Sequence, residues 1–230
     1  MIDLHSHFLP KIDDGARSVN ESISMLEDSK KQGVNLCVAT PHIAIHREES
    51  IDNFLAKRDK SVALLKEKIK ELKADVPEIA YGAEIFLDND ISSYKKLEKL
   101  CIADTKILLI ELSPMAYNPL YAEWLYSLTL KGFVPVVAHI ERYPYISEFM
   151  AELDGVEVIY QMNAKSLLKN KWRKFLAELY ENGKRVVVAS DMHNMGFRKC
   201  MLEKAKAKFE KHHTDIVQDV FYAVPQSLIK

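Results

Sequence analysis

The sequence predicts an α/β protein built on a parallel sheet, and within that class a barrel of seven β/α units. Seven short, β-rich apolar runs alternate with helical patterns along the 230 residues. Many of these runs are nearly continuous in Val, Ile and Leu, as strands buried on both faces are. Nearly every run ends, on its C-terminal side, in a residue that could bind a metal ion. Barrel enzymes carry their active sites at that edge, so this pattern favours a closed barrel over an open doubly wound sheet.

The expected strands are mostly four to eight residues long, and no linker interrupts their succession. They cover residues 2–5, 34–39, 78–85, 106–112, 134–139, 156–162 and 185–189. The first helix is predicted by the capping box that begins at Ser18 and ends at Glu21, and Gly33 follows its last turn.

The later helices are predicted from periodicity and end signals. Residues 50–73 place apolar side chains at three- and four-residue steps. Pro119 suits a first helical position and Gly132 an end. Residues 166–181 and 198–213 are expected to form amphipathic helices.

Composition and charge exclude several classes of protein. The chain has 32 Lys and Arg against 33 Asp and Glu, a formal net charge of −1, which argues against binding nucleic acid by bulk electrostatics. No apolar run approaches the roughly 20 residues of a membrane span, and the N-terminus lacks a signal-peptide pattern. Cys37, Cys101 and Cys200 are odd in number and far apart, which suits reduced thiols in the cytoplasm. We expect a single domain over residues 1–230, and a homo-oligomer is left open.

Imidazole and carboxylate side chains gather at the ends of the expected strands. His5 and His7 close the first strand, and because residues i and i+2 of a strand point the same way, both face one site. Asp191 and His193 repeat this spacing after the last strand. The candidate metal ligands are His5, His7, Asp14, His42, Glu84, Glu111, His139, Asp191 and His193.

The ligand types indicate several divalent cations. Carboxylates buried side by side without a counter-charge would cost several kcal/mol each. Imidazole and carboxylate without thiolate exclude a cysteine-bound structural zinc and suit Mn²⁺, Fe²⁺, Zn²⁺ or Co²⁺. Nine ligands are too many for one ion, so two or three are expected, with Glu111 placed to bridge two of them. Three dications among four carboxylates leave two surplus positive charges, which would attract a phosphate monoester.

Two arginines follow the candidate ligands closely. Arg142 comes three residues after His139, and Arg198 comes five residues after His193. Guanidinium forks match the geometry of phosphate oxygens. We therefore expect Arg142 and Arg198 to clamp a phosphate beside the metal ions.

Several motifs together carry a family resemblance. They are MIDLHSHFLPKIDDG at 1–15, ATPH at 39–42, YGAEI at 81–85, residues 110–112, PVVAHIERY at 135–143 and ASDMHNMGFR at 189–198. In these stretches the chain resembles the PHP (polymerase and histidinol phosphatase) superfamily. Within it the chain is most similar to the bacterial manganese-dependent protein-tyrosine phosphatases of capsule and exopolysaccharide operons (CpsB/CapC/YwqE type). The resemblance implies a distorted (β/α)₇ barrel with a trinuclear metal site.

The resemblance also implies roles for individual residues. It groups His5, His7, Glu111 and Asp191 around one metal ion, Glu84, Glu111 and His139 around a second, and Asp14, His42 and His193 around a third. Arg142 and Arg198 match the family's phosphate-binding arginines, and His46 is a candidate outer substrate contact.

We therefore expect a metal-dependent phosphomonoester hydrolase in which metal-activated hydroxide attacks phosphorus. The resemblance suggests that it removes phosphate from the phosphotyrosine tail of a cognate bacterial tyrosine kinase that regulates capsule or exopolysaccharide synthesis. A cysteine phosphatase is excluded because no Cys-x₅-Arg occurs.

Other functions remain as alternatives. A small-molecule phosphatase of the histidinol-phosphate type and a PHP-type exonuclease belong to the same superfamily, and the near-neutral charge weighs against the exonuclease. Metal amidohydrolases also begin with His-x-His but have eight strands. A non-catalytic binding module is disfavoured because no ligand position is lost.

Overall fold

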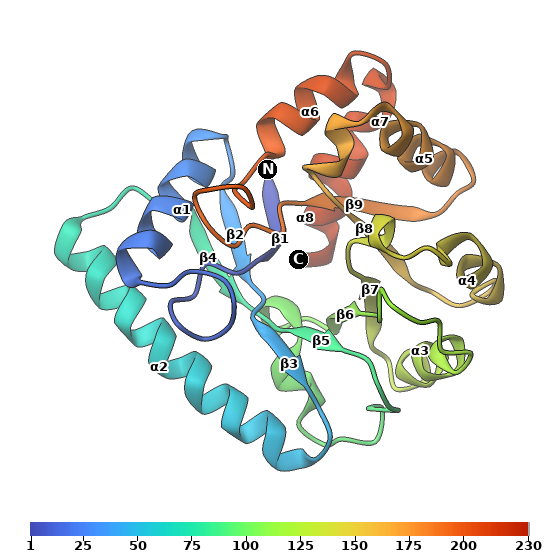
Figure 1. Ribbon diagram of the computed structural model, residues 1–230, viewed down its shortest axis with the longest axis horizontal. Coiled ribbons are helices and arrows are strands. Elements are labelled where there is room, and N and C mark those ends of the chain that lie inside the picture. The colour runs from blue at the N-terminus through green and yellow to red at the C-terminus, as the bar shows by residue number, and fades with distance from the viewer. Residues whose placement is uncertain (230) are drawn as a thin grey trace.

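The computed structural model describes residues 1–229 and wraps parallel strands into a barrel with helices outside it (Figure 1). The strands are β1 (Ile2–Ser6), β2 (Leu36–Ala39), β3 (His42–Ala44), β4 (Glu78–Tyr81), β5 (Glu84–Phe86), β6 (Ile107–Glu111), β7 (Val134–Val137), β8 (Ile159–Asn163) and β9 (Arg185–Ala189). Hydrogen bonds join them in the orders β1-β2-β4 and β3-β5-β6-β7-β8-β9. Every ladder between these strands is parallel, so the predicted α/β class is confirmed.

Seven expected strands become nine because the third is broken in two and the second is followed, outside its predicted range, by the extra strand β3. The strand expected at 78–85 divides into β4 and β5, and β3 continues the course of β2. The two breaks lie at the same level of the sheet. Pro41 in the first break has no amide hydrogen for a ladder, while Gly82 in the second donates to the carbonyl of Ala39. The barrel therefore keeps its seven strand positions but is distorted, as the resemblance implies.

The barrel is closed between β1 and the residues that follow β9. The amide of Asp191 donates to the carbonyl of His5 at 2.9 Å, and the amide of His7 donates to the carbonyl of Met192 at 2.9 Å. Below this pair, the buried Asp3 carboxylate accepts the amide of Ser190 at 2.8 Å. Burial raises the pKa of Asp3 to about 6, although Ser190 and His5 oppose this shift. At this seam a buried carboxylate therefore adds to the backbone hydrogen bonds that join the first and last strands.

The helices largely follow the sequence signals. They are α1 (Val19–Lys31), α2 (Glu48–Leu72), α3 (Tyr121–Leu130), α4 (Ile146–Glu152), α5 (Asn170–Glu181), α6 (Leu202–Glu210), α7 (Thr214–Gln218) and α8 (Val224–Ile229). The Ser18 hydroxyl accepts the amide of Glu21, as the capping box predicts. The returning bond of the box is displaced by one residue, since the Glu21 carboxylate accepts the amide of Arg17.

Two predicted helices are shorter than expected. Residues 166–168 form a separate 3₁₀ turn before α5. The helix expected at 198–213 begins only at Leu202, because the Asn194 side chain accepts the amides of Gly196 and Arg198 and holds this segment as a loop. Pro119 lies two residues before α3 rather than at its first position.

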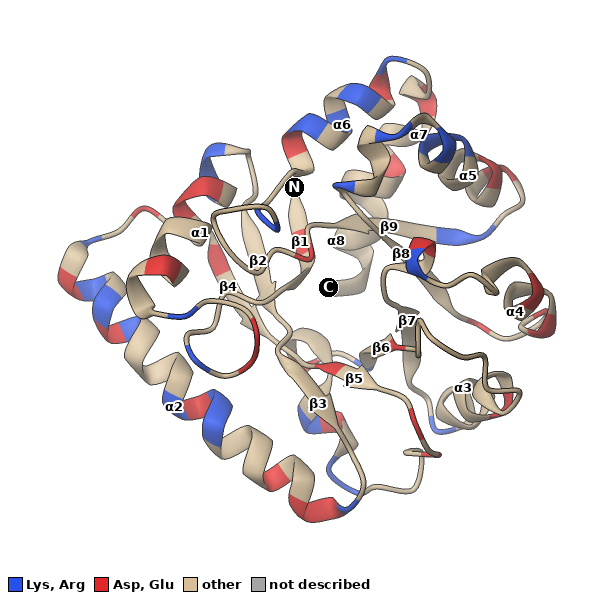
Figure 2. Ribbon diagram, in the orientation of Figure 1, with Lys and Arg blue, Asp and Glu red and all other residues tan. Residues whose placement is uncertain are grey.

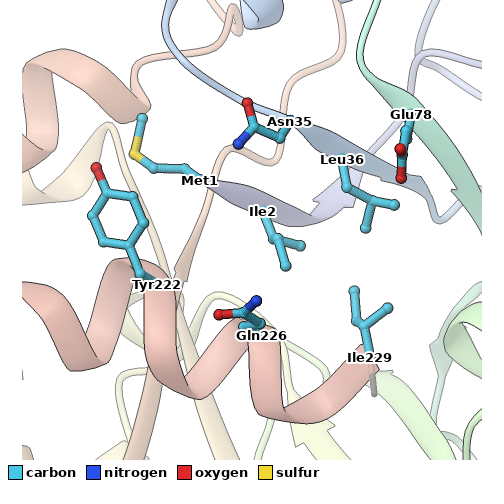
Figure 3. Close-up of a pocket in the computed structure, with 8 residues that line it drawn as sticks. All are labelled: Met1, Ile2, Asn35, Leu36, Glu78, Tyr222, Gln226 and Ile229. Carbon is cyan, nitrogen blue, oxygen red and sulfur yellow. The ribbon is translucent and has the colours of Figure 1, made fainter.

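Helix α8 packs beneath the barrel against β1 and β9, in a part of the chain where the sequence analysis predicts no element. Leu228 of α8 joins an apolar cluster drawn mainly from the strands, which includes Leu4, Val38 and Val136. Beside α8 lies a cavity of about 370 Å³ between the beginnings of β1, β2 and β4 and the residues Tyr222 and Gln226 (Figure 3). This cavity is at the opposite end of the strands from the candidate ligands. Within residues 1–229, no helix combines the length and apolar character needed to cross a bilayer.

Candidate metal centre

The C-terminal rim of the barrel gathers five imidazoles and four carboxylates. All nine side chains come from the ends of strands or from the loops that follow them, apart from His42 and Glu84, which open the upper strands β3 and β5. They are His5, His7, Asp14, His42, Glu84, Glu111, His139, Asp191 and His193. The structure thus brings together every residue that the sequence proposes as a metal ligand.

Glu84 lies at the centre of this cluster and is fully buried. Its Oε2 atom is 3.0 Å from Nε2 of His5, 3.1 Å from Nε2 of His7 and 3.1 Å from Nδ1 of His42. Its Oε1 atom is 2.9 Å from Nε2 of His139. One carboxylate therefore touches four imidazoles.

Three groups in the cluster have donor atoms close enough to share an ion. They are His5, His7 and Glu84; His42, Glu84 and Glu111; and His7, Asp14, His42 and His193. The last contains the set that the resemblance assigns to its third metal ion. Asp191 lies 3.6 Å from His5 and 3.7 Å from His7, whereas Glu111 contacts His42 and His139. The donor atoms therefore fall into more than one overlapping group.

A chain of amide side chains orients the cluster, and the sequence analysis missed it. The carbonyl oxygen of Gln161 accepts the backbone amide of His139 and lies 2.9 Å from Nδ1 of His5. The Gln161 amide donates to Asn163, which donates to Asp191 at 2.7 Å. Gln161 and Asn163 stand at i and i+2 at the end of the sixth strand position. The spacing that singled out His5 and His7 could have found them, but uncharged amides gave no signal.

Asp13 is a second orienting residue, distinct from its neighbour Asp14. Its carboxylate lies 2.8 Å from Nδ1 of His7 and also accepts the amide of His42. The loop returns to the site at Gly15, where a Cβ atom would lie 2.0 Å from the carbonyl oxygen of His7. A carboxylate partner fixes the proton of a neutral imidazole on Nδ1. With Nδ1 held by Asp13, Nε2 of His7 faces Glu84 and is the ring atom that would bind a cation once it has lost its proton.

The arrangement of charges shifts the pKa of two imidazoles upward. Burial lowers the pKa of His7, but the contacts with Asp13 and Glu84 outweigh it and raise the pKa to about 10. For His139, burial is likewise outweighed, here by Glu111 and Glu84, and the pKa rises to about 9. Without a cation, the carboxylates thus hold extra protons on these imidazoles at neutral pH.

Other pKa values in the cluster move downward. Burial raises the pKa of Asp191, but the positive charges of His5 and His7 outweigh it and bring the value to about 2. The same kind of contact holds the pKa of Glu84 well below its usual range against the effect of burial. Burial and the nearby charge of His7 lower the pKa of His193 to about 3, so its imidazole is neutral. Ionised carboxylates and a neutral imidazole are the forms that bind metal ions.

The donor set fits divalent cations on two further observations. His193 Nε2 is buried with no hydrogen-bond partner within residues 1–229, and Glu84 Oε2 has imidazole nitrogens at 3.0 to 3.1 Å but no well-oriented hydrogen bond. Such orphaned atoms are costly unless an ion satisfies them. In addition, His139 and Asp191 have positive φ angles, 31° and 51°, which are uncommon for residues other than glycine. Backbone strain of this kind concentrates at functional sites.

The two arginines differ in their surroundings. Arg198 donates to Asp191 at 2.9 Å and reaches Asp14 at 3.5 Å, so it is joined to the cluster. Arg142 ends a 3₁₀ turn that begins after His139, and its exposed side chain makes no hydrogen bond or ion pair to the described part of the chain. His46 is also exposed and lies 3.5 Å from Asp88.

The cysteines lie apart from this site. Cys37, Cys101 and Cys200 are free and buried. Burial raises the pKa of the Cys101 and Cys200 thiols to about 12, and that of Cys37 well above its usual range. Thiols of this kind are not nucleophiles at neutral pH.

A parallel α/β barrel with clustered imidazoles and carboxylates at its C-terminal rim defines a metal-dependent hydrolase of the barrel type. Residues 1–230 match the family described as capsular polysaccharide synthesis, CpsB/CapC. The chain belongs to this family.

Named relatives agree with this assignment. The chain is 34% identical to the tyrosine-protein phosphatase YwqE of Bacillus subtilis, with 92% of this chain and 84% of YwqE covered. It is 32% identical to the tyrosine-protein phosphatase CpsB of Streptococcus pneumoniae, with 100% and 98% covered.

Solved structures support the fold. A structure from a study of YwqE and CpsB, described as unique metal-dependent tyrosine phosphatases, superposes with a TM-score of 0.83 at 26% identity, covering 100% of this chain and 94% of the other. The phosphotriesterase homology protein of Escherichia coli superposes with a TM-score of 0.59 at 12% identity, covering 100% and 98%, which indicates a shared barrel fold.

Proposed function

We propose that the chain is a metal-dependent tyrosine-protein phosphatase whose reaction takes place at the Glu84 cluster. The observation that carries the proposal is the contact of one buried carboxylate with four imidazoles, next to an arginine already joined to the cluster. Membership of the CpsB/CapC family supports the same reaction. The nine predicted ligands would hold two or three divalent cations, with Mn²⁺ the first choice and Fe²⁺, Zn²⁺ or Co²⁺ as alternatives.

Each part of the site has a task in phosphate hydrolysis. When bound, divalent cations lower the pKa of water and neutralise phosphoryl charge. Gln161, Asn163 and Asp13 hold the ligand side chains in position, so that little reorganisation is needed during the reaction. Arg198 and Arg142 would bind the phosphoryl oxygens from two sides of the rim. The phenol of tyrosine has a pKa near 10, so its departure needs less help from an acid than that of an alkyl alcohol.

We further propose that the substrate is a phosphotyrosine protein, of which the tail of a cognate bacterial tyrosine kinase is the first candidate. The tyrosine-protein phosphatases that the chain resembles support this choice. The three free thiols suit action in the reducing cytoplasm, where such a tail would be met.

A panel of substrates tests the proposal. With added Mn²⁺, we expect hydrolysis of a phosphotyrosine peptide and of an aryl phosphate, and much slower hydrolysis of histidinol phosphate. Iodoacetamide should leave these rates unchanged, because the raised thiol pKa values keep all three cysteines protonated. Fast turnover of histidinol phosphate without turnover of the peptide would refute the substrate assignment, and inactivation by iodoacetamide would refute the metal mechanism.

The exposed arginine offers a separate test of the phosphate clamp. We expect Arg142→Ala to lower kcat/KM for an aryl phosphate by about 100-fold, because one guanidinium contact to the phosphoryl oxygens is lost. The thermal midpoint should not change, since the Arg142 side chain is exposed and makes no polar contact within residues 1–229. Arg142→Lys should recover only part of the rate. Unchanged kinetics in Arg142→Ala would remove this residue from the clamp.

A further inference from the structure

One side of the rim is strongly basic. Between Glu157 and Glu178 the chain has five Lys or Arg residues and no Asp or Glu. Lys165, Lys169 and Lys171 are exposed and lie where the chain leaves β8 and enters α5. Figure 2 shows Lys and Arg in blue on α5 and on the neighbouring α6, on the side of the barrel occupied by β8 and β9. We call Lys165, Lys169 and Lys171 the basic strip.

The basic strip is joined to the metal centre through the loop after β9. The Lys165 ammonium donates to the carbonyl of Phe197 at 2.7 Å and lies 4.7 Å from the centre of the Phe197 ring. Phe197 is 78% exposed, although the Asn194 side chain holds its loop through the amides of Gly196 and Arg198. The next residue, Arg198, reaches Asp191 and Asp14. The apolar ring of Phe197 and the ammonium group of Lys165 therefore lie next to Arg198, the residue that contacts the cluster.

The loop that follows β5 carries exposed carboxylates, although His46 and Arg47 lie on the neighbouring loop after β3. Asp88 and Asp90 are exposed and follow β5, which is separated from β8 in the sheet by β6 and β7. A chain lying across the mouth would meet ammonium groups on one side and carboxylates on the other. Complementary charges of this kind set the direction in which a partner binds.

We propose that the basic strip and Phe197 bind an acidic polypeptide segment on one side of the phosphotyrosine of the substrate. This inference rests on the proposed phosphatase function and adds a preference among its substrates. The Phe197 ring would contact an apolar part of the segment, and the lysines would pair with carboxylates or further phosphates. An acidic segment on the other side of the phosphotyrosine would lie near Asp88 and Asp90, and it would not increase the affinity of binding.

Binding of inert peptides tests the proposal without relying on turnover. Labelled peptides would carry a non-hydrolysable phosphonate analogue of phosphotyrosine, flanked by Gln, by Glu on the N-terminal side only, or by Glu on the C-terminal side only. Fluorescence anisotropy in low salt should show binding about fivefold tighter for one Glu-flanked peptide alone, as two exposed ion pairs would give. The difference should vanish in high salt. Peptides that carry phosphoserine in place of Glu on the preferred side would show whether the basic strip binds phosphate groups or carboxylates more tightly.

Matched charge reversals locate the effect. Lys169→Glu combined with Lys171→Glu should abolish the preference, and the new carboxylates at the start of α5 suit the helix dipole, so the fold should be kept. Lys57→Glu combined with Lys60→Glu, on the exposed face of α2, makes the same change of charge away from the strip and should leave the preference intact.

The outcomes separate this proposal from the proposed function. Both double variants should hydrolyse a small aryl phosphate at the wild-type rate. A wild-type preference that survives Lys169→Glu/Lys171→Glu, or no preference at all, overturns the basic strip while phosphatase activity stands. If the wild-type protein with added Mn²⁺ does not hydrolyse an aryl phosphate, the proposed function is overturned instead. Binding to phosphatidylserine vesicles that depends on Lys169 and Lys171, without any peptide preference, would assign the strip to a membrane and overturn the proposal.

Discussion

Replacing Glu84 with glutamine is expected to lower kcat/KM for an aryl phosphate by roughly 1,000-fold or more. The substitution keeps the shape of the side chain but removes the charge that four imidazoles face. An amide is also a much weaker ligand for a divalent cation than a carboxylate. Elemental analysis of purified protein should therefore show fewer metal ions per chain in Glu84→Gln than in the wild type.

Glu78→Gln provides the matched control. Glu78 is exposed at the beginning of β4, at the opposite end of the barrel, so the same chemical change should affect neither rate nor metal content. A Glu84→Gln protein with wild-type activity and wild-type metal content would place the reaction elsewhere.

Removal of metal ions by a chelator should abolish hydrolysis without unfolding the protein. Protons can take the place of part of the cationic charge, because the pKa of His7 is raised to about 10 and that of His139 to about 9, so both are protonated at neutral pH. Added Mn²⁺ should restore activity. Since these imidazoles must lose their protons to bind a metal ion, metal affinity should rise as the pH increases towards about 9.

Circular dichroism and calorimetry check both parts of this expectation. The far-ultraviolet spectrum should persist after chelation, and the heat of Mn²⁺ binding should vary with the ionisation enthalpy of the buffer, because protons are released. Hydrolysis that continues after the metal content has fallen well below one ion per chain would contradict a metal-dependent reaction.

The order and number of barrel positions could be predicted from sequence because runs of Val, Ile and Leu mark strands buried on both faces. The breaks between β2 and β3 and between β4 and β5 could not be predicted in this way. Pro41 and Gly82 are visible in the sequence, but only the three-dimensional structure shows that they face each other at one level and divide two strands. The helices beneath the barrel were missed for a similar reason, since Leu228 gains its role from strand residues far away in the chain.

The candidate ligands could be predicted because their chemistry and their position at strand ends are both local signals. The residues that orient them could not. Gln161, Asn163 and Tyr143 carry no charge, and their partners are distant in sequence. The Tyr143 hydroxyl accepts the amide of Leu112 and lies 3.2 Å from Nδ1 of His139, which ties two loops of the rim together.

Asp191 belongs both to the predicted ligands and to the pair of hydrogen bonds between β1 and the end of β9. A cation bound by this carboxylate would therefore also strengthen the connection between β1 and β9. Metal binding and the stability of the barrel closure would then be linked, so that the barrel is most stable in the metal-bound form.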